Sequence, residues 1–408
     1  PPPSPPPPSS PPSPPPSPPP PPPSLPPSLL HSLHLSSLDG TNGIVLNGVY
    51  AGDYVGWAVA GAGDVNGDGV ADVIIGGGTA YPEGEVFTVF GSASGIVSPL
   101  DLGSLDGTNG VIIRGMDSQT GYDGGLYNGQ AGLSVAGAGD FNGDGVPDVI
   151  IDAPYTAGVG EAYVVFGNAS GIASPLDLGS LNGTNGVVIR GIFGSRSVAG
   201  AGDVNGDGVA DMVISAPFAA GNAGEVYIVY GSASGFASLL NLSSLDGSTG
   251  FIIRGIDIRD EVGDSVAGAG DVNADGVADV IIGAPYAAGG AGEVYIVFGS
   301  VSGFTSPLHL SSLDGTNGLV IRGMEAEGYA GWSVAGAGDV NGDGVADMVI
   351  GASGAAGNAG EVYIVFGSAS GFMSPLNVSS LDGTNGVVLR GIDIWDEAGA
   401  SVAGAGDV

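Results

Sequence analysis

The feature that most constrains this chain is a twelve-residue segment, GAGDVNGDGVAD at residues 61–72, that recurs along it. Related copies occupy 137–148, 200–211, 268–279 and 336–347, and a sixth copy begins at residue 404. The first Asp of successive copies is separated by 76, 63, 68, 68 and 68 residues. A period of this length indicates one supersecondary unit that stacks on its neighbours, so the chain is a repeat protein.

Each repeat predicts four short strands, here named A to D in chain order. In the fourth repeat SVAGAGDV is strand A, ADVIIGAP follows the acidic loop as strand B, GEVYIVFGS is strand C and GLVIRG is strand D. Turn residues separate them, and no segment shows sustained helical periodicity. A four-stranded antiparallel meander at this interval predicts an all-β fold, a β-propeller with one blade per repeat. The Gly- and Ala-rich strand A suits the crowded position nearest the propeller axis.

The repeats resemble the FG-GAP repeats of integrin α-subunit propellers and of many secreted proteins. Phe-Gly occurs in four repeats and Tyr230-Gly231 in the third, while Gly-Ala-Pro is intact at residues 283–285. The resemblance covers essentially residues 40–408 and implies a propeller that is usually seven-bladed. Five complete A–D units are visible, with a lone D-like strand at 44–47 and an incomplete repeat from 401.

The acidic loop has the pattern D-x-N-x-D-G-x-x-D, at 64–72, 140–148, 203–211, 271–279 and 339–347. Positions 1, 3 and 5 place side-chain oxygens inside a tight turn, position 7 can add a backbone carbonyl and position 9 another carboxylate. Hard oxygen ligands of this number favour Ca²⁺, about one per complete repeat. The alternative is a plain Asx-rich turn, in which the acids would repel one another. The predicted metal ligands are Asp64, Asn66, Asp68, Val70, Asp72, Asp140, Asn142, Asp144, Val146, Asp148, Asp203, Asn205, Asp207, Val209, Asp211, Asp271, Asn273, Asp275, Val277, Asp279, Asp339, Asn341, Asp343, Val345 and Asp347.

Composition excludes several classes of function. The formal net charge is −35, so the chain should repel nucleic acid and anionic lipid. No run of apolar residues is long enough to span a membrane. There is no Cys or Lys and only three His, so catalytic residues find no support and we expect no enzyme. An Arg recurs in each repeat, and we interpret it as a structural partner for acids; these residues are Arg114, Arg190, Arg254, Arg322 and Arg390.

The chain divides into a leader at 1–27 and the repeat domain at 28–408. The leader holds 20 Pro among its 27 residues and predicts a polyproline II rod or linker. Its Ser/Pro pattern resembles the hydroxyproline-rich glycoproteins of plant and algal cell walls. Other Pro-rich linkers and SH3 or WW ligands are the alternatives. The chain begins without Met and ends inside a motif, which we interpret as a processed or partial chain.

Four N-x-S/T sequons fall in the C–D connections, at Asn168, Asn182, Asn241 and Asn377. A meander places A–B and C–D turns on one face, so the metals and the candidate glycans should share it. The opposite face carries the variable D–A loops, where Tyr122, Tyr127, Tyr329 and Trp395 could contact a glycan or a protein. The alternative, given equal weight, is that these aromatic side chains only pack within their own turns.

Two functions follow. The first is a non-enzymatic, calcium-binding structural glycoprotein of a cell wall, matrix or surface fibre, located outside the cell and able to assemble head to tail with itself. The second is an adhesion or recognition ectodomain that binds a glycan or an extracellular protein through the D–A face.

Overall fold

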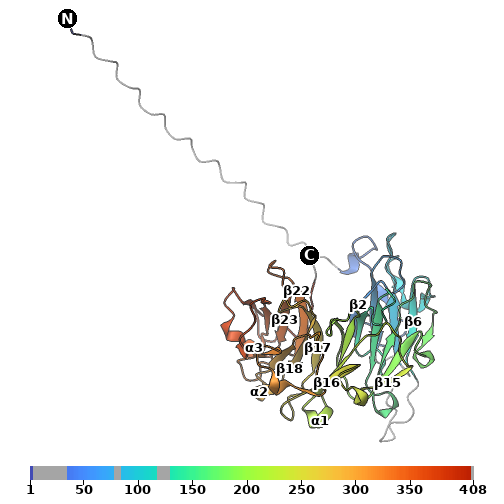
Figure 1. Ribbon diagram of the computed structural model, residues 1–408. Helices are drawn as coiled ribbons and strands as arrows, with labels where there is room; N and C mark the ends of the chain where they lie inside the picture. The colour runs from blue at the N-terminus through green and yellow to red at the C-terminus, as the bar shows by residue number, and fades with distance from the viewer. Residues whose placement is uncertain (3–34, 78–83, 117–128, 406–408) are drawn as a thin grey trace.

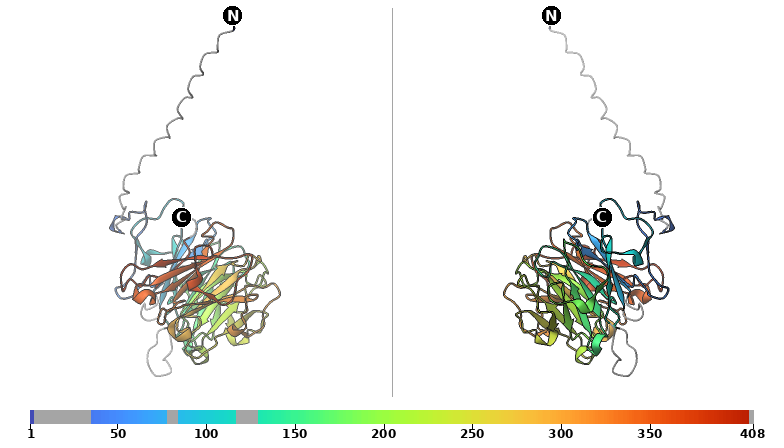
Figure 2. Two further views of the ribbon diagram at one scale, coloured as in Figure 1. Left: turned by 90° about the vertical axis from the view of Figure 1, so that its left-hand side faces the viewer. Right: turned by 90° about the vertical axis from the view of Figure 1, so that its right-hand side faces the viewer.

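The computed structural model describes residues 1–2, 35–77, 84–116 and 129–405. Five antiparallel four-stranded sheets follow one another along the chain, each with its strands in the order A to D. Figures 1 and 2 show them packed side by side as blades. The predicted all-β fold and the four-stranded unit are therefore confirmed.

The blades contain the following strands. The first has β2 (Ala58–Gly63), β3 (Asp72–Gly77), β4 (Glu85–Val89) and β6 (Gly110–Arg114); the second has β7 (Val135–Gly139), β8 (Asp148–Ala153), β9 (Glu161–Val165) and β11 (Gly186–Arg190); the third has β12 (Val198–Gly202), β13 (Asp211–Ala216), β14 (Glu225–Val229) and β16 (Gly250–Arg254). The fourth has β17 (Ser265–Gly270), β18 (Asp279–Ala284), β19 (Glu293–Val297) and β21 (Gly318–Arg322); the fifth has β22 (Ser333–Gly338), β23 (Asp347–Ala352), β24 (Glu361–Val365) and β26 (Gly386–Arg390).

Strand A of each blade lies against strand A of the next, and this contact explains its small residues. A Cβ atom on Gly200 would lie 2.7 Å from the carbonyl oxygen of Gly137 in the preceding blade. The same spacing recurs at the next two boundaries, and at Gly404 a Cβ would lie 2.6 Å from the carbonyl oxygen of Gly336. Residues 401–405 thus lie beside β22 as another strand A would, although they form no strand pairing; the last three residues of the predicted strand lie outside the described part.

The hydrophobic core is distributed between blades. Four clusters of buried side chains each join two consecutive blades; one of them brings Val213 and Ile228 of the third blade together with Ile282 and Tyr295 of the fourth. The apolar residues of strands B and C supply both faces of each sheet. Each blade therefore buries its faces only with its neighbours, as expected for a repeat protein.

A fifth, parallel strand on the outer edge of each of the first four blades was not predicted. It comes from the C–D connection of the following repeat; for example, Leu376 and Asn377 pair with Ile321 and Arg322. These segments, such as Pro-Leu-His-Leu at residues 307–310, fall in C–D connections for which only turns are predicted, yet their alternation is typical of a short strand. These strands are β10 (Leu176–Asp177), β15 (Leu239–Asn241), β20 (Leu308–His309) and β25 (Leu376–Asn377).

The predicted D-like strand at 44–47 is present in part. β1 (Leu46–Asn47) pairs in parallel with β5 (Leu100–Asp101), in the same way that a strand D pairs with the next repeat. Short helical turns fill the B–C and C–D connections. They are α1 (Ala219–Asn222), α2 (Ala287–Gly290), α3 (Ala355–Asn358), and the 3-10 turns η1 (Leu35–Ser37), η2 (Leu102–Ser104), η3 (Thr156–Gly158), η4 (Leu178–Ser180), η5 (Leu242–Ser244), η6 (Leu310–Ser312) and η7 (Val378–Ser380).

Candidate functional site

The five acidic loops connect strands A and B and share one geometry. In the first loop the two carboxylate oxygens of Asp64 accept hydrogen bonds from the backbone N–H groups of Asp68, at 2.9 Å, and Gly69, at 2.7 Å. The Oδ1 atom of Asn66 also accepts from the N–H of Asp68, at 2.9 Å. The other four loops repeat these three bonds. The side chains at positions 1 and 3 therefore turn into the loop, as the pattern predicts.

The Asp at position 9 joins the loop to the Phe-Gly turn. Asp72 is buried at the start of β3; its Oδ2 accepts from the N–H of Val65 at 2.9 Å, and its Oδ1 accepts from the N–H of Gly91 at 2.7 Å. The same residue does this in every repeat. A Cβ atom on Gly91 would lie 2.3 Å from the carbonyl oxygen of Ala71, so the turn requires Gly. Position 9 thus fixes strand C as well as the loop.

These buried carboxylates lie among other acids. Burial is the largest cause that raises the pKa of Asp148, Asp211 and Asp279 to about 7, and neighbouring carboxylates of the same loop raise it further. Burial also raises the pKa of Asp72. A bound cation would oppose this effect by favouring the ionised form.

The donor set fits a hard divalent cation. Each loop offers three carboxylates and one amide, whose oxygen atoms could all serve as metal ligands. Within the described residues, no group of three or more His, Cys, Asp and Glu side chains is gathered so that it could hold a metal ion. The loop carboxylates accept hydrogen bonds instead from backbone N–H groups and from the Asn side chain at position 3. All the predicted ligands lie in these loops, and their binding of calcium stays a prediction.

The fourth loop differs from the others at position 4. Ala274 adopts the left-handed conformation, with φ of 59°, where the other loops have Gly; Gly206 of the third loop has φ of 72°. This conformation is unfavourable for a residue with a Cβ atom. The hydrogen bonds of the fourth loop are nevertheless the same.

The recurrent Arg is a structural partner for acids, as predicted. Arg254 Nε on strand D contacts Glu225 Oε1 at the start of strand C, at 3.0 Å, and the Tyr227 hydroxyl donates to the other carboxylate oxygen at 2.8 Å. All five repeats form the Arg–Glu pair, and the second to fifth add the Tyr. This arrangement closes the blade end opposite the acidic loops.

Aromatic side chains gather at that opposite end, on the D–A loops and B–C turns. Tyr286 near α2 packs edge-on against Tyr329 and Trp332 of the next repeat, with ring centroids 5.7 and 6.5 Å apart. Trp57 and Trp395 are 66% and 72% exposed. We call the surface formed by the D–A loops and B–C turns the recognition face. Of the aromatic residues predicted there, Tyr122 and Tyr127 lie outside the described residues.

The candidate glycosylation sites do not all share the acidic-loop face. The backbone N–H of Asn168 donates to the carbonyl of Val65 in the first acidic loop, and Asn182 lies in the turn before strand D at the same end. Asn241 and Asn377, however, pair in register with the recurrent Arg at the other end of strand D. The prediction of one common face is wrong for these two, because the unforeseen parallel strand carries the C–D connection across the blade.

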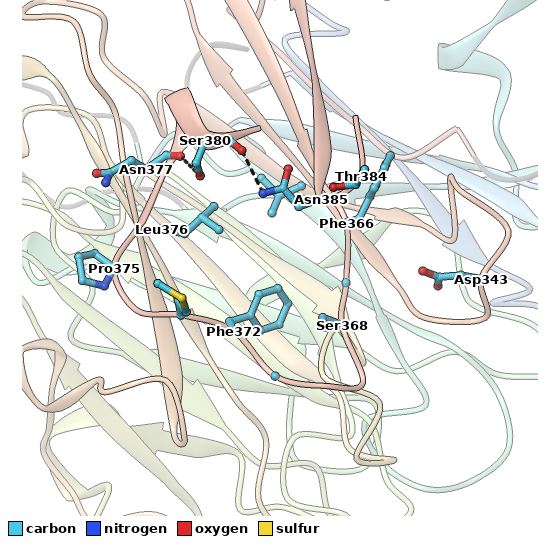
Figure 3. Close-up of a pocket in the computed structure, with 14 residues that line it drawn as sticks. Asp343, Phe366, Ser368, Phe372, Pro375, Leu376, Asn377, Ser380, Thr384 and Asn385 are labelled. Carbon is cyan, nitrogen blue, oxygen red and sulfur yellow. Dashed lines mark hydrogen bonds between the residues drawn. The ribbon is translucent and has the colours of Figure 1, made fainter. Parts of the chain in front are cut away.

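A surface pocket of about 470 Å³ lies on the fifth repeat, lined by the C–D connection that includes Phe372 and Leu376. Figure 3 shows these side chains with Asp343 of the fifth acidic loop at one side. In the fourth repeat the corresponding turn is covered by the next repeat, and a Cβ atom on Gly315 would lie 3.1 Å from the carbonyl oxygen of Phe372. The pocket is therefore a blade-contact surface, and we assign it no ligand.

Comparisons with known proteins agree with this geometry. The FG-GAP repeat matches residues 195–229, 262–297 and 330–365. The chain is 33% identical over 237 residues to integrin alpha pat-2 of Caenorhabditis elegans, which covers 54% of this chain and 18% of that protein. It is 29% identical over 288 residues to integrin alpha-4 of Xenopus laevis, covering 69% and 24%.

A third relative is the phosphatidylinositol-glycan-specific phospholipase D of Bos taurus, 33% identical over 192 residues, covering 44% of this chain and 21% of that protein. The chain thus spans about a fifth of the length of these relatives. In the described part, no helix is long and apolar enough to cross a membrane. The matched residues hold strands A to C and the acidic loops of the third, fourth and fifth repeats, so the chain contains FG-GAP repeats in an integrin-α-like β-propeller architecture.

Proposed function

We propose that this chain is an extracellular, non-enzymatic recognition propeller, stabilised by calcium in its acidic loops, that binds a protein or glycan through the recognition face. The observation that carries the proposal is the separation of two chemistries. Acidic loops with a repeated internal geometry occupy one end of the blades, and exposed aromatic side chains occupy the other. Exposed aromatic side chains are enriched in protein interfaces.

Calcium has a structural role in this proposal. Each loop clips strand A to strand B and, through position 9, to the end of strand C. Binding of an ion would neutralise the acids that crowd each turn and add stability to the folded state. Five ions would reduce the formal net charge from −35 to −25.

The charge distribution suggests the chemistry of the partner. Six of the seven Arg residues form ion pairs with Asp or Glu of the same chain. The chain therefore presents mostly negative charge to a ligand, which favours partners with a basic surface. The integrin relatives support a protein ligand as the first class to test.

Binding assays on the native chain test the proposal. Trp332→Ala and Trp395→Ala should weaken binding to immobilised matrix proteins or glycans by about tenfold or more each, as aromatic hot spots do. Met373→Ala is the matched control, because Met373 is exposed but lies on a C–D connection. Equal loss of binding in all three variants would contradict the assignment of the recognition face.

The second candidate is a structural component of a wall, matrix or fibre. It is favoured by the Pro-rich leader, of which residues 3–27 lie outside the described residues. It is also favoured by the outer parallel strands, which would serve an extended assembly. Light scattering of native protein in calcium distinguishes the two roles: a monomer over a wide range of concentration supports the recognition role, and growing particles support head-to-tail assembly.

A further inference from the structure

A pair of substitutions distinguishes the boundary between the second and third blades. After the first, fourth and fifth blades, strand B and the next D–A loop meet through two Gly residues; a Cβ atom on Gly283 would lie 2.0 Å from the carbonyl oxygen of Gly331. Between the third and fourth blades, Ser215 meets Gly263. Between the second and third blades the corresponding residues are Asp152 in β8 and Ser195 just before β12. The two side chains face each other. At this boundary both Gly positions are therefore changed together, one to Asp and the other to Ser.

The D–A loop at this boundary makes room for the larger side chains. The third repeat follows the second after 63 residues, five fewer than the common step of 68, and four of these five are missing from the D–A loop. The shortened loop, residues 191–197, folds back through a hydrogen bond from the N–H of Ser195 to the carbonyl of Ile192, at 2.8 Å. The polar pair is therefore built into a specific, shorter loop.

Neither side chain has a conventional partner. Asp152 is 0% exposed and Ser195 is 1% exposed, and neither the two carboxylate oxygens nor the Ser195 hydroxyl forms a hydrogen bond that satisfies normal geometry in the described structure. An ionised carboxylate without a partner is costly in a protein interior, whereas a protonated one can donate to the adjacent hydroxyl after a small movement.

The charged groups around Asp152 and Ser195 already form ion pairs or hydrogen bonds with other residues. Arg196, next to Ser195, forms an ion pair with Asp264 and lies over the ring of Phe218. Glu161, on the adjacent strand β9, is held by Arg190 and the Tyr163 hydroxyl. No cation of these elements is left to stabilise a carboxylate at Asp152.

We propose that Asp152 and Ser195 form a buried proton-binding site that couples pH to the D–A loop 191–197. Protonated Asp152 holds the loop against the second blade, and ionisation loosens this contact. The loop presents Phe193, which is 57% exposed, on the recognition face. The proton site stands on the structure alone; its effect on binding rests on the function proposed above.

The direction of the effect follows from burial, which raises the pKa of Asp152 to about 8 from an ordinary value of 3.8. Between these two pKa values, the folded state binds a proton at Asp152 that the unfolded chain has released. The stability contributed by protonation is fully present below the unfolded pKa and is lost as the pH rises toward the folded pKa.

The test compares denaturant unfolding of wild type and Asp152→Asn in saturating calcium, so that the acidic loops contribute equally to both. Between about pH 5 and about pH 7, the folding equilibrium constant of wild type should fall about 100-fold relative to the variant, tenfold per pH unit. Asp393→Asn, at an exposed acid on another D–A loop, should leave the profile parallel to wild type. Parallel profiles for Asp152→Asn would overturn the proposal.

A second variant guards against a local misfold. Asp152→Gly with Ser195→Gly installs the Gly pair found after the first, fourth and fifth blades and should also remove the extra pH dependence; a profile parallel to wild type overturns the proposal. Hydrogen exchange of residues 191–197 should increase above about pH 8 in wild type alone, after correction for intrinsic rates.

These measurements need no ligand, so a failure of the recognition function would leave them unaffected. If the site holds but binding shows no matching pH dependence, only the coupling to recognition is wrong.

Discussion

The carboxylate at position 9 gives the sharpest prediction, because the structure shows what it holds. Asp279 is fully buried and accepts from two backbone donors, the N–H of Val272 and the N–H of Gly299, each at 2.8 Å. Asp279→Ala leaves both donors without a partner. A buried unsatisfied donor costs about 1–3 kcal/mol, so the variant should lose about 2–6 kcal/mol of unfolding free energy.

Asp279→Asn separates the hydrogen bonds from the charge. The amide keeps one acceptor oxygen and places an NH₂ group against the other donor, so about half of the loss should remain. Both costs should persist in EDTA, because the two hydrogen bonds need no metal. In calcium the cost of Asp279→Ala should grow, since a predicted ligand is also removed.

Urea unfolding of wild type and both variants, with EDTA and with excess calcium, measures these differences. Asp275→Ala is the matched control, because Asp275 belongs to the same loop but is exposed and accepts only local bonds. A cost below about 1 kcal/mol for Asp279→Ala in EDTA would show that position 9 does not join the loop to strand C.

Four other experiments test the remaining assignments. Calcium should raise the melting temperature of wild type and EDTA should lower it. Identical melting curves would refute the five metal sites. In calcium, Asp275→Ala should lose more unfolding free energy than Asn273→Ala. Ala274→Gly relieves a left-handed conformation and should stabilise by about 1 kcal/mol, measured by urea unfolding, while no gain would mean that the loop bears no strain. Tyr230→Phe removes a buried hydroxyl without a hydrogen-bond partner and should be neutral or stabilising by about 1 kcal/mol in thermal unfolding; a clear loss would reveal an unseen partner. Native residues 1–27 should carry hydroxyproline and sugars in mass spectra, and an unmodified peptide would leave only a spacer role.

Much of the fold could be predicted because the repeat period and the strand patterns are local. The D-x-N-x-D-G-x-x-D pattern also predicts which side chains turn into the loop, since Asx side chains bond to nearby backbone N–H groups. The dual role of Asp72 could not be predicted, because Gly91 lies far along the chain. The parallel strand from Leu376 was missed for a similar reason: two residues form no recognisable period, and their partners belong to the preceding repeat.

The Asp152 and Ser195 pair shows a different limit. The alignment of the repeats places Asp152 where three other repeats have Gly and the third has Ser215, which by itself shows only that Gly-Ala-Pro is not intact in the second repeat. Its meaning depends on Ser195, which sits at another Gly position in the next repeat. Comparing both positions across all five repeats would have revealed the joint change, although not that the two residues meet.

The outer parallel strands make the unit of duplication different from the unit of folding. Strand D of one blade hydrogen-bonds to a segment encoded in the next repeat; the N–H of Ile252, for example, donates to the Ser306 hydroxyl at 3.2 Å. During synthesis, no blade of this kind can complete its outer edge until much of its successor has emerged from the ribosome. Folding should therefore proceed from the N-terminus in overlapping steps. In evolution, gain or loss of one whole repeat would leave every such overlap chemically intact, so that blade number can change without a new interface.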